Sequence, residues 1–473
     1  MTTSPTAVPV PGKPLLLLGA FDIGDVGYVA NEFFMSATAS SYRPQGDLGP
    51  DGRWHVNPSA TGEYTTRVVV LTPTDQTRFN GTALVEWLNV SGGIDAPAVW
   101  MMAHREVLRA GYAYVMVSVQ KVGVDGGMSL LGIDMSLKSQ NPNRYGELSH
   151  PGDAFAYDIF SQAGQLVRDG GILGGLSAEH VVALGESQSA MFLTSYINAV
   201  DPLAQVFDGF LVHSRFGPAA PLDGGSIFEV LESGTAQAVK FSPDLRVPLL
   251  TIITETDLFG AQLLGYHAAR QPDHDLLRVW EIAGAAHADN YTIQVAPIDS
   301  GFAPIEDLAA AYAPTSNLMG QQLDHHINFG PQHHYVVQAA LAALHSWVRD
   351  GTAPPTGPPL ELRETASPEP VLDVNGIAVG GVRTPWVDVP VARTTGAAET
   401  GETGETGENI MAAIFGSGEY FDEATLSRLY PGGVDEYLGS FTAALDSAID
   451  AGFILTADRD EILQLAAATY PRG

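Results

Sequence analysis

The chain has 473 residues, of which 45% are hydrophobic and 16% charged, and this composition is typical of a globular protein rather than a disordered one. Its formal net charge of −31 argues against nucleic-acid binding, which needs clustered Lys and Arg, and against binding to anionic lipid. The chain has no cysteine, which excludes disulfides, thiolate metal sites and cysteine nucleophiles.

No apolar run approaches the roughly 20 residues that span a bilayer. The apolar stretch 15–18 has neither the length nor the preceding charge of a signal peptide. We therefore expect a cytoplasmic protein with no cleaved leader and no membrane association.

Strands and helices alternate along most of the chain. Up to residue 72 the sequence predicts short extended segments separated by turns. The expected strands are 64–71, 83–88, 112–119, 180–184, 209–212, 247–253 and 277–282. The expected helices are 99–110, about 153–168, 188–200 and 332–349. This alternation predicts an α/β fold with a mostly parallel central sheet, helices on both faces and functional loops at the carboxyl ends of the strands.

The C-terminal part of the chain differs in composition. Residues 394–408 read TTGAAETGETGETGE, which cannot build a core and predicts a flexible linker. We therefore divide the chain into an α/β domain over 1–393 and a helical extension over 409–473 that packs back on it. Two long segments, 121–150 and 218–243, are candidates for lids over a site.

Residues 185–189 carry the central motif. They read Gly-Glu-Ser-Gln-Ser, directly after an expected strand and directly before an expected helix. A sharp turn of this kind raises the hydroxyl of Ser187 above the sheet, and small flanking residues let the helix pass close to the strand. The commonest motifs of this type have Gly where Ser189 stands. We expect Ser187 to be a nucleophile; the alternative is an incidental Ser in a turn.

The partners of such a nucleophile follow it in the order acid, then His. His287 lies in a loop of small residues just after the expected strand 277–282. Glu255 and Asp257 both follow the expected strand 247–253. We expect His287 to be the base and Asp257 the acid that orients it, with Glu255 as the alternative acid.

An oxyanion hole needs two backbone N–H groups directed at the developing negative charge. Gln188, the residue after the nucleophile, is expected to supply one. The loop 89–93 after the expected strand 83–88 is expected to supply the other, from Ser91 or its neighbour Val90.

A family resemblance rests on seven stretches, which include the motifs described above. They are VEWLNVSGG at 85–93, YGELSHPGDAFAYDIFSQ at 145–162, LGESQSA at 184–190, ETD at 255–257, GAAHAD at 284–289, GGVRTPWVDVPVA at 380–392 and YFDEATLSRLYPGGVDEYL at 420–438. In these the chain resembles the large bacterial α/β-hydrolase-domain family, over nearly its whole length apart from 394–408. The resemblance implies an α/β-hydrolase fold and a triad of Ser, His and acid.

Two pairs of adjacent histidines, 325–326 and 333–334, invite a zinc interpretation. Adjacent imidazoles diverge and do not easily bind one ion, so we expect no metal and no other cofactor, and interpret these residues as polar contacts or pocket lining. The stretch HSRF at 213–216 ends a strand, where it either lines the substrate site or closes the sheet.

These observations predict a serine hydrolase that cleaves small-molecule carboxylic esters or lactones through an acyl-enzyme. Two alternatives stay open. One is an acyltransferase with the same residues, and the other is a non-catalytic binding protein on the same fold.

Overall fold

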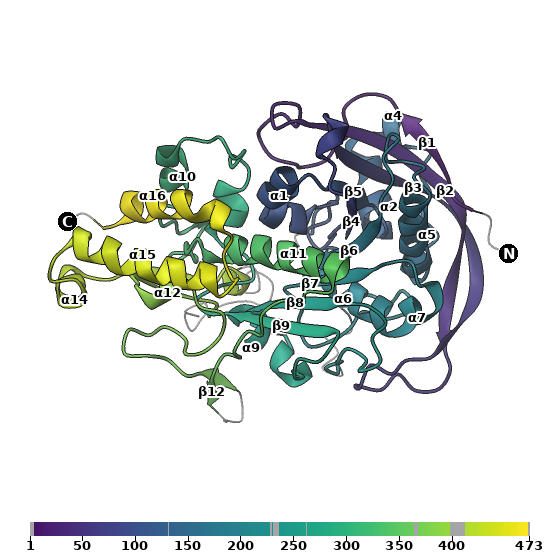
Figure 1. Cartoon of the computed structure of the whole chain (residues 1–473). Coiled ribbons are helices and arrows are strands. Elements are labelled where there is room, and N and C mark those ends of the chain that lie inside the picture. Colours follow the sequence, from purple (N-terminus) through teal and green to yellow (C-terminus); the bar gives the residue numbers. More distant parts are fainter. Residues whose placement is uncertain are drawn as a thin grey trace.

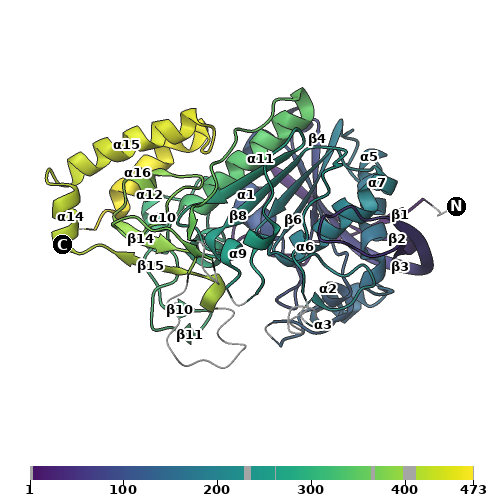
Figure 2. The ribbon, with the colours of Figure 1, turned by 90° about the horizontal axis from the view of Figure 1, so that it is seen from below.

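The structure, a computed structural model, describes residues 4–130, 132–227, 229, 236–261, 263–363, 368–397 and 412–471. Its centre is a nine-stranded sheet with the order β1-β2-β3-β5-β4-β6-β7-β8-β9 (Figures 1 and 2). The strands are β1 (Thr6–Val10), β2 (Tyr28–Pro44), β3 (Val56–Pro73), β4 (Thr82–Trp87), β5 (Ala113–Val117), β6 (His180–Glu186), β7 (Gly209–His213), β8 (Leu249–Thr254) and β9 (Leu277–Ile282).

The sheet is antiparallel at its N-terminal edge and parallel elsewhere. β1, β2, β3 and β5 pair antiparallel in turn, and all pairs from β5 through β4 to β9 are parallel. The predicted mostly parallel sheet is therefore confirmed. The prediction of short segments before residue 72 is wrong, because β2 and β3 form one long hairpin of 17 and 18 residues.

Helices cover both faces of the sheet, as predicted. α1 (Ala98–Ala110) and α11 (Gln332–Asp350) share one hydrophobic core with the sheet, and α5 (Ala156–Arg168) and α6 (Gln188–Ser195) share the other. Neighbouring strand residues alternate between these cores: Ala183 belongs to the α5–α6 side and Leu184 to the α1–α11 side. Burial on both faces explains why these strands are continuous apolar runs.

Further elements complete the fold. The other helices whose bounds the structure describes are α2 (Lys121–Asp125), α3 (Leu137–Gln140), α4 (Pro142–Tyr145), α7 (Asp201–Ala204), α9 (Glu255–Phe259), α10 (Ile305–Ala311), α12 (Pro385–Asp388), α14 (Glu423–Leu429), α15 (Val434–Asp450) and α16 (Arg459–Thr469). Single turns of 3-10 helix lie at Gln76–Arg78, Asp153–Phe155, Tyr266–Ala269 and Thr456–Asp458, and π-helical turns at Tyr196–Val200 and Tyr291–Val295. Small two-stranded antiparallel sheets pair β10 (Asn317–Leu318) with β11 (Gln321–Gln322), β12 (Leu362–Arg363) with β13 (Glu369–Pro370), and β14 (Ala392–Thr395) with β15 (Ser417–Tyr420).

The C-terminal helices α14, α15 and α16 lie at the end of the molecule opposite to β1–β3 (Figures 1 and 2). α16 packs on α10, and Arg105 and Arg109 of α1 bind Glu461 and Asp458 at 3.0 and 2.6 Å. The predicted linker begins too early, because residues 394–395 belong to β14 and pair with β15. The rest of that prediction, from residue 398 onward, lies outside the described residues.

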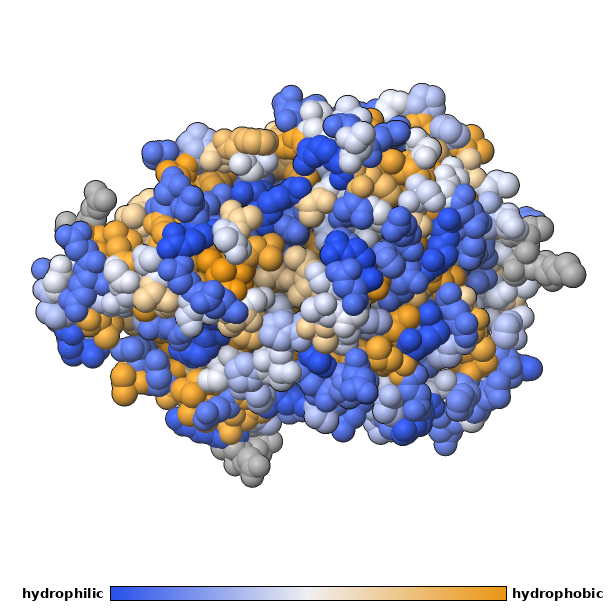
Figure 3. Space-filling view, in the orientation of Figure 1, coloured by the Kyte–Doolittle hydropathy of each residue, from blue (hydrophilic) through white to orange (hydrophobic). Residues whose placement is uncertain are grey.

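The predicted lid segment 121–150 contains α2, α3 and α4, and the other, 218–243, is described only at 218–227, 229 and 236–243. Among the described residues, no helix combines the length and apolarity needed to cross a membrane. Polar and apolar side chains are intermixed on the face shown in Figure 3.

Candidate active site

Ser187 stands between the end of β6 at Glu186 and the start of α6 at Gln188. Its φ of 56° and ψ of −117° lie in a region that residues other than Gly rarely adopt. Its backbone N–H donates to the carbonyl oxygen of His213, at the end of β7, at 3.0 Å. The residue is partly exposed. The strained turn therefore holds the hydroxyl of Ser187 at the carboxyl end of the sheet, within reach of other loops.

Small residues on both sides of Ser187 let α6 pass close to β6. A Cβ atom at Gly185 would lie 3.0 Å from the carbonyl oxygen of Ser189, a contact tighter than most Cβ atoms make. Ser189 itself is fully buried. The spacing Gly-x-Ser-x-Ser therefore has a packing reason, and Ser is small enough to stand in the last position.

His287 lies in the loop after β9 and contacts Ser187 directly. Its Nε2 is 2.8 Å from the Ser187 hydroxyl, and its Nδ1 is 2.5 Å from Oδ1 of Asp257. The ring of Phe216 stacks on the imidazole with 5.1 Å between centroids. Burial opposes the charged imidazolium, but the carboxylates of Asp257 and Glu186 outweigh it and hold the pKa of His287 above its ordinary value. The imidazole is thus oriented as a proton acceptor for Ser187.

Asp257 is held by the first turn of α9. Its Oδ2 accepts hydrogen bonds from the backbone N–H and the hydroxyl of Thr254, both at 2.8 Å, and Thr254 caps the helix in return. This leaves Oδ1 for His287. The capping box therefore sets the direction of the carboxylate that orients the imidazole.

Glu255, the alternative acid, is directed elsewhere. Its Oε1 accepts from the backbone N–H of Gly284 at 2.6 Å, and its Oε2 accepts from the Thr395 hydroxyl and the Gly396 N–H, each at 2.8 Å. Burial raises its pKa. Glu255 thus connects the loop before His287 to the end of β14, and the structure brings Asp257 rather than Glu255 to the imidazole.

The structure distinguishes the two residues of the loop 89–93 that were expected as alternative oxyanion donors. The N–H and the hydroxyl of Ser91 both donate to Oδ1 of Asn89 at 2.8 Å, so this N–H is already engaged. The N–H of Val90 instead donates to Oε1 of Gln188 at 3.2 Å, beside the nucleophile. The N–H of Gln188 belongs to the first turn of α6, where helix geometry offers no partner. Both N–H groups have acceptors, but that of Val90 contacts the residue directly after Ser187, so Val90 is the better candidate of the two alternatives.

Glu186 is the residue near the site that the sequence analysis missed. Its Oε1 lies 3.6 Å from Nε2 of His287, and its Oε2 accepts from Nδ2 of Asn89 at 3.2 Å. Burial raises the pKa of Glu186 to about 7, although the charge of His287 lowers it. A charged residue directly before Ser187, inside the motif, was the signal available in the sequence.

His213 and His333, from two motifs singled out in the sequence, contact each other, and the backbone carbonyl of His213 accepts the N–H of Ser187. Their Nε2 atoms are 2.8 Å apart, and both residues are fully buried. Burial, and then the charges of His333 and His287, hold the pKa of His213 well below its usual range. Nδ1 of His333 lies 3.6 Å from Oδ2 of Asp289. One imidazole therefore donates to the other, and the pair links β7 to the start of α11.

The other paired histidines make ordinary contacts. His334 stacks on the ring of Tyr291 at 3.7 Å between centroids, and His325 binds its neighbour Asp324 at 2.9 Å. Within the part of the chain that the structure describes, no three His, Cys, Asp or Glu side chains are grouped as metal ligands.

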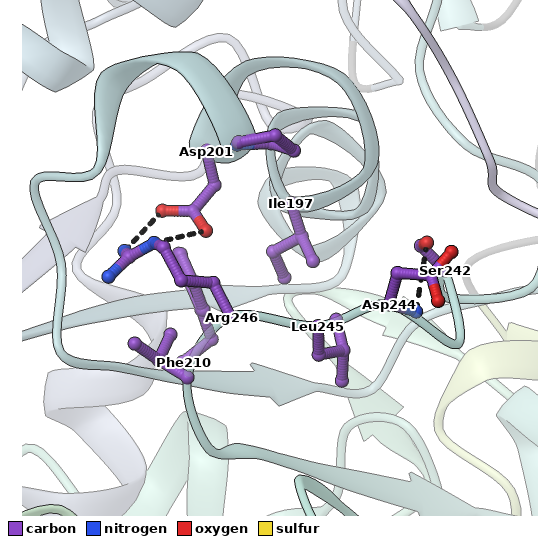
Figure 4. A pocket seen from close by; sticks show the side chains of 9 residues that line it. Ile197, Asp201, Phe210, Ser242, Asp244, Leu245 and Arg246 are labelled. Atoms are coloured by element: carbon purple, nitrogen blue, oxygen red, sulfur yellow. Dashed lines mark hydrogen bonds and ion pairs between the residues drawn. The ribbon is translucent and has the colours of Figure 1, made fainter.

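A small pocket lies at the opposite end of the sheet (Figure 4). Ile197 and Phe210 line it, and an ion pair of 2.7 Å between Arg246 and Asp201 borders it. These residues lie near the amino ends of β7 and β8, whereas Ser187 follows the carboxyl end of β6. The pocket is therefore separate from the candidate active site.

Comparison with known proteins places the chain in a family. No curated protein matches the sequence. One of two fungal esterases from Rhizomucor miehei is 12% identical with a TM-score of 0.32, over 66% of this chain and 84% of that chain. A thermostable esterase from Pseudomonas putida ECU1011 is 13% identical with a TM-score of 0.27, over 50% and 66%. A family described as "Alpha/beta hydrolase domain" matches residues 2–464. The chain therefore belongs to this alpha/beta hydrolase family.

Proposed function

We propose that the protein is a carboxylic ester hydrolase in which Ser187 is the nucleophile, His287 the general base and Asp257 the orienting acid. One observation carries this proposal: the three side chains, from three different strand ends, form a continuous row of hydrogen bonds of 2.8 and 2.5 Å. A nucleophile, a base within hydrogen-bonding reach and a group that orients the base are the parts that acyl transfer needs.

In acylation, Nε2 of His287 takes the hydroxyl proton as Oγ of Ser187 forms a bond to the ester carbonyl carbon. The imidazolium that results is stabilised by Asp257, which does not itself take the proton. The carbonyl oxygen becomes an oxyanion. When the intermediate collapses, the bond to the alcohol oxygen breaks, and His287 gives its proton to that oxygen. The products are the free alcohol and an acyl group on Ser187.

In deacylation, the same groups act on water. His287 takes a proton from the water as its oxygen attacks the acyl carbonyl carbon, and then returns that proton to Oγ of Ser187 as the acyl bond breaks. The carboxylic acid leaves, and the hydroxyl and the neutral imidazole are restored.

The backbone N–H groups of Val90 and Gln188 are the proposed donors to the oxyanion. They flank Ser187 from the loop after β4 and from the start of α6. The amide oxygen of Gln188 now accepts the Val90 N–H at 3.2 Å, which supports the view that an oxygen fits at this position. A substrate carbonyl oxygen would replace it there.

The test is hydrolysis of p-nitrophenyl acetate by the wild type, Ser187→Ala and Ser189→Ala. Ser189 is a matched control, because it lies two residues after Ser187, at the start of α6, and its side chain is fully buried. We expect Ser187→Ala to lose activity by about 10³-fold or more and Ser189→Ala to retain it. Equal activity of the wild type and a folded Ser187→Ala variant would refute the proposal.

A further inference from the structure

Large apolar side chains are exposed together in the segment 126–135, between α2 and α3. Met128, Leu130, Ile133 and Met135 are between 37% and 61% exposed. Apolar residues exposed singly are normal in proteins, whereas these four lie within eight positions of one another. We call these four residues the apolar segment.

The apolar segment lies directly on the loop that holds the proposed oxyanion donor. The N–H of Leu130 donates to the carbonyl oxygen of Ser91 at 2.8 Å, and the N–H of Met135 donates to that of Gly93 at 3.0 Å. Gly93 has a φ of +79°, and a Cβ atom there would lie 2.3 Å from the carbonyl oxygen of Ile133. The contact is therefore close enough that residue 93 has to be Gly.

Ion pairs join the two helices that flank the apolar segment. Asp125, the last residue of α2, binds Lys121 of the same helix at 2.5 Å and Lys138 of α3 at 2.7 Å. Asp134 accepts from the backbone N–H of Ser136 at the start of α3 at 3.0 Å. The two helices are thus tied together.

We propose that the apolar segment binds the hydrocarbon acyl chain of the ester substrate. The inference rests on the proposed function: if the N–H of Val90 binds the carbonyl oxygen, the acyl chain starts beside the loop 89–93, and the apolar segment is hydrogen-bonded to Ser91 and Gly93 of that loop. The net charge of −31 disfavours an anionic lipid surface as the partner. An uncharged ester with an extended hydrocarbon chain, bound as a single molecule from solution, fits both the charge and the position.

The experiment compares p-nitrophenyl octanoate with p-nitrophenyl acetate, each below its solubility limit. The variant is Met128→Ser with Ile133→Ser, and the matched control is Phe302→Ser with Val374→Ser, which removes exposed apolar side chains elsewhere. We expect the first variant to lose about tenfold in kcat/KM for the octanoate and nothing for the acetate, because only the longer chain reaches the segment. The control variant should change neither value.

Other outcomes would overturn the proposal. An equal loss on both esters would mean that the segment only supports the loop 89–93. An unchanged kcat/KM of the variant for the octanoate would mean that the acyl chain binds elsewhere. A wild-type dimer that the variant dissociates, with ester selectivity unchanged, would identify a second copy as the partner.

Binding of 2-decanone, an uncharged ketone that cannot be hydrolysed, separates this inference from the proposed function. If the wild type hydrolyses neither ester, the proposed function fails. Weaker binding of 2-decanone to the Met128→Ser, Ile133→Ser variant would then still support an apolar chain site, and equal binding to wild type and variant would refute it.

Discussion

Oε1 of Glu186 lies 3.6 Å from Nε2 of His287, the nitrogen that also contacts the Ser187 hydroxyl. The imidazole therefore faces one carboxylate at Nδ1 and a second one near Nε2. Burial raises the pKa of Glu186 to about 7, and the charges of Asp257 and Glu186 raise that of His287 against the effect of burial. Because the two groups interact at close range, Glu186 and His287 are expected to titrate as a coupled pair.

Glu186→Gln should move the acidic limb of the pH profile to lower pH. His287 acts as a base only when neutral, so activity falls as the pH drops through its pKa. Removing the neighbouring negative charge lowers that pKa, and the neutral form then persists to lower pH. The measurement is kcat/KM for p-nitrophenyl acetate against pH, with Glu179→Gln, an exposed carboxylate just before β6, as control. A limb that stays in place or moves to higher pH would contradict the assigned electrostatics.

Asp257→Asn should lower kcat by roughly 10³- to 10⁴-fold while the protein stays folded. The amide at this position can still bind Thr254, but it cannot stabilise an imidazolium and it favours the wrong imidazole tautomer. The measurement is kcat for p-nitrophenyl acetate, with the melting temperature as the check on folding. Near-full activity in this variant would remove Asp257 from the mechanism.

Glu255→Gln should affect stability more than catalysis. The carboxylate accepts hydrogen bonds from Gly284, Thr395 and Gly396, and an amide would direct N–H groups at donors. We expect a loss of about 1–3 kcal/mol in the free energy of unfolding, measured by denaturant titration. The reverse pattern, with activity lost here and kept in Asp257→Asn, would identify Glu255 as the acid.

Gln188→Ala should lower KM and leave kcat nearly unchanged. The substitution removes the amide oxygen that accepts the Val90 N–H, so the substrate carbonyl no longer competes with it, while the backbone N–H of residue 188 remains. Initial rates over a range of p-nitrophenyl acetate concentrations separate the two constants. A higher KM would mean that the side chain of Gln188 holds the loop 89–93 in its working position rather than occupying the site.

The elements that sequence patterns predicted well are those buried on both faces. β6 and β8 are continuous apolar runs with β-branched residues, and each is bounded by turn residues, so periodicity alone locates them. β2 was not predicted, because its central stretch reads Ser-Ala-Thr-Ala-Ser-Ser, which contains no large apolar residue to indicate a strand. Its extended conformation depends on pairing with β3, which is information that the segment itself does not carry.

In the candidate site, too, the sequence predicted some residues and left others open. Sequence position relative to predicted strands was enough to select Ser187 and His287, which the structure places 2.8 Å apart. The choice between Asp257 and Glu255 depends on the capping box at Thr254. The choice between Val90 and Ser91 depends on which N–H group donates to the Asn89 side chain. Such choices are set by side-chain hydrogen bonds, which spacing in a sequence does not determine.

The most direct test of the account is reaction of the folded protein with a fluorophosphonate, followed by mass spectrometry of the modified peptide. An activated serine beside a neutral imidazole attacks phosphorus, whereas ordinary serines do not react. The account predicts one modification, on Ser187, that is lost in Ser187→Ala and strongly reduced in His287→Ala. Modification of a different residue, or no modification of the folded wild type, would contradict it.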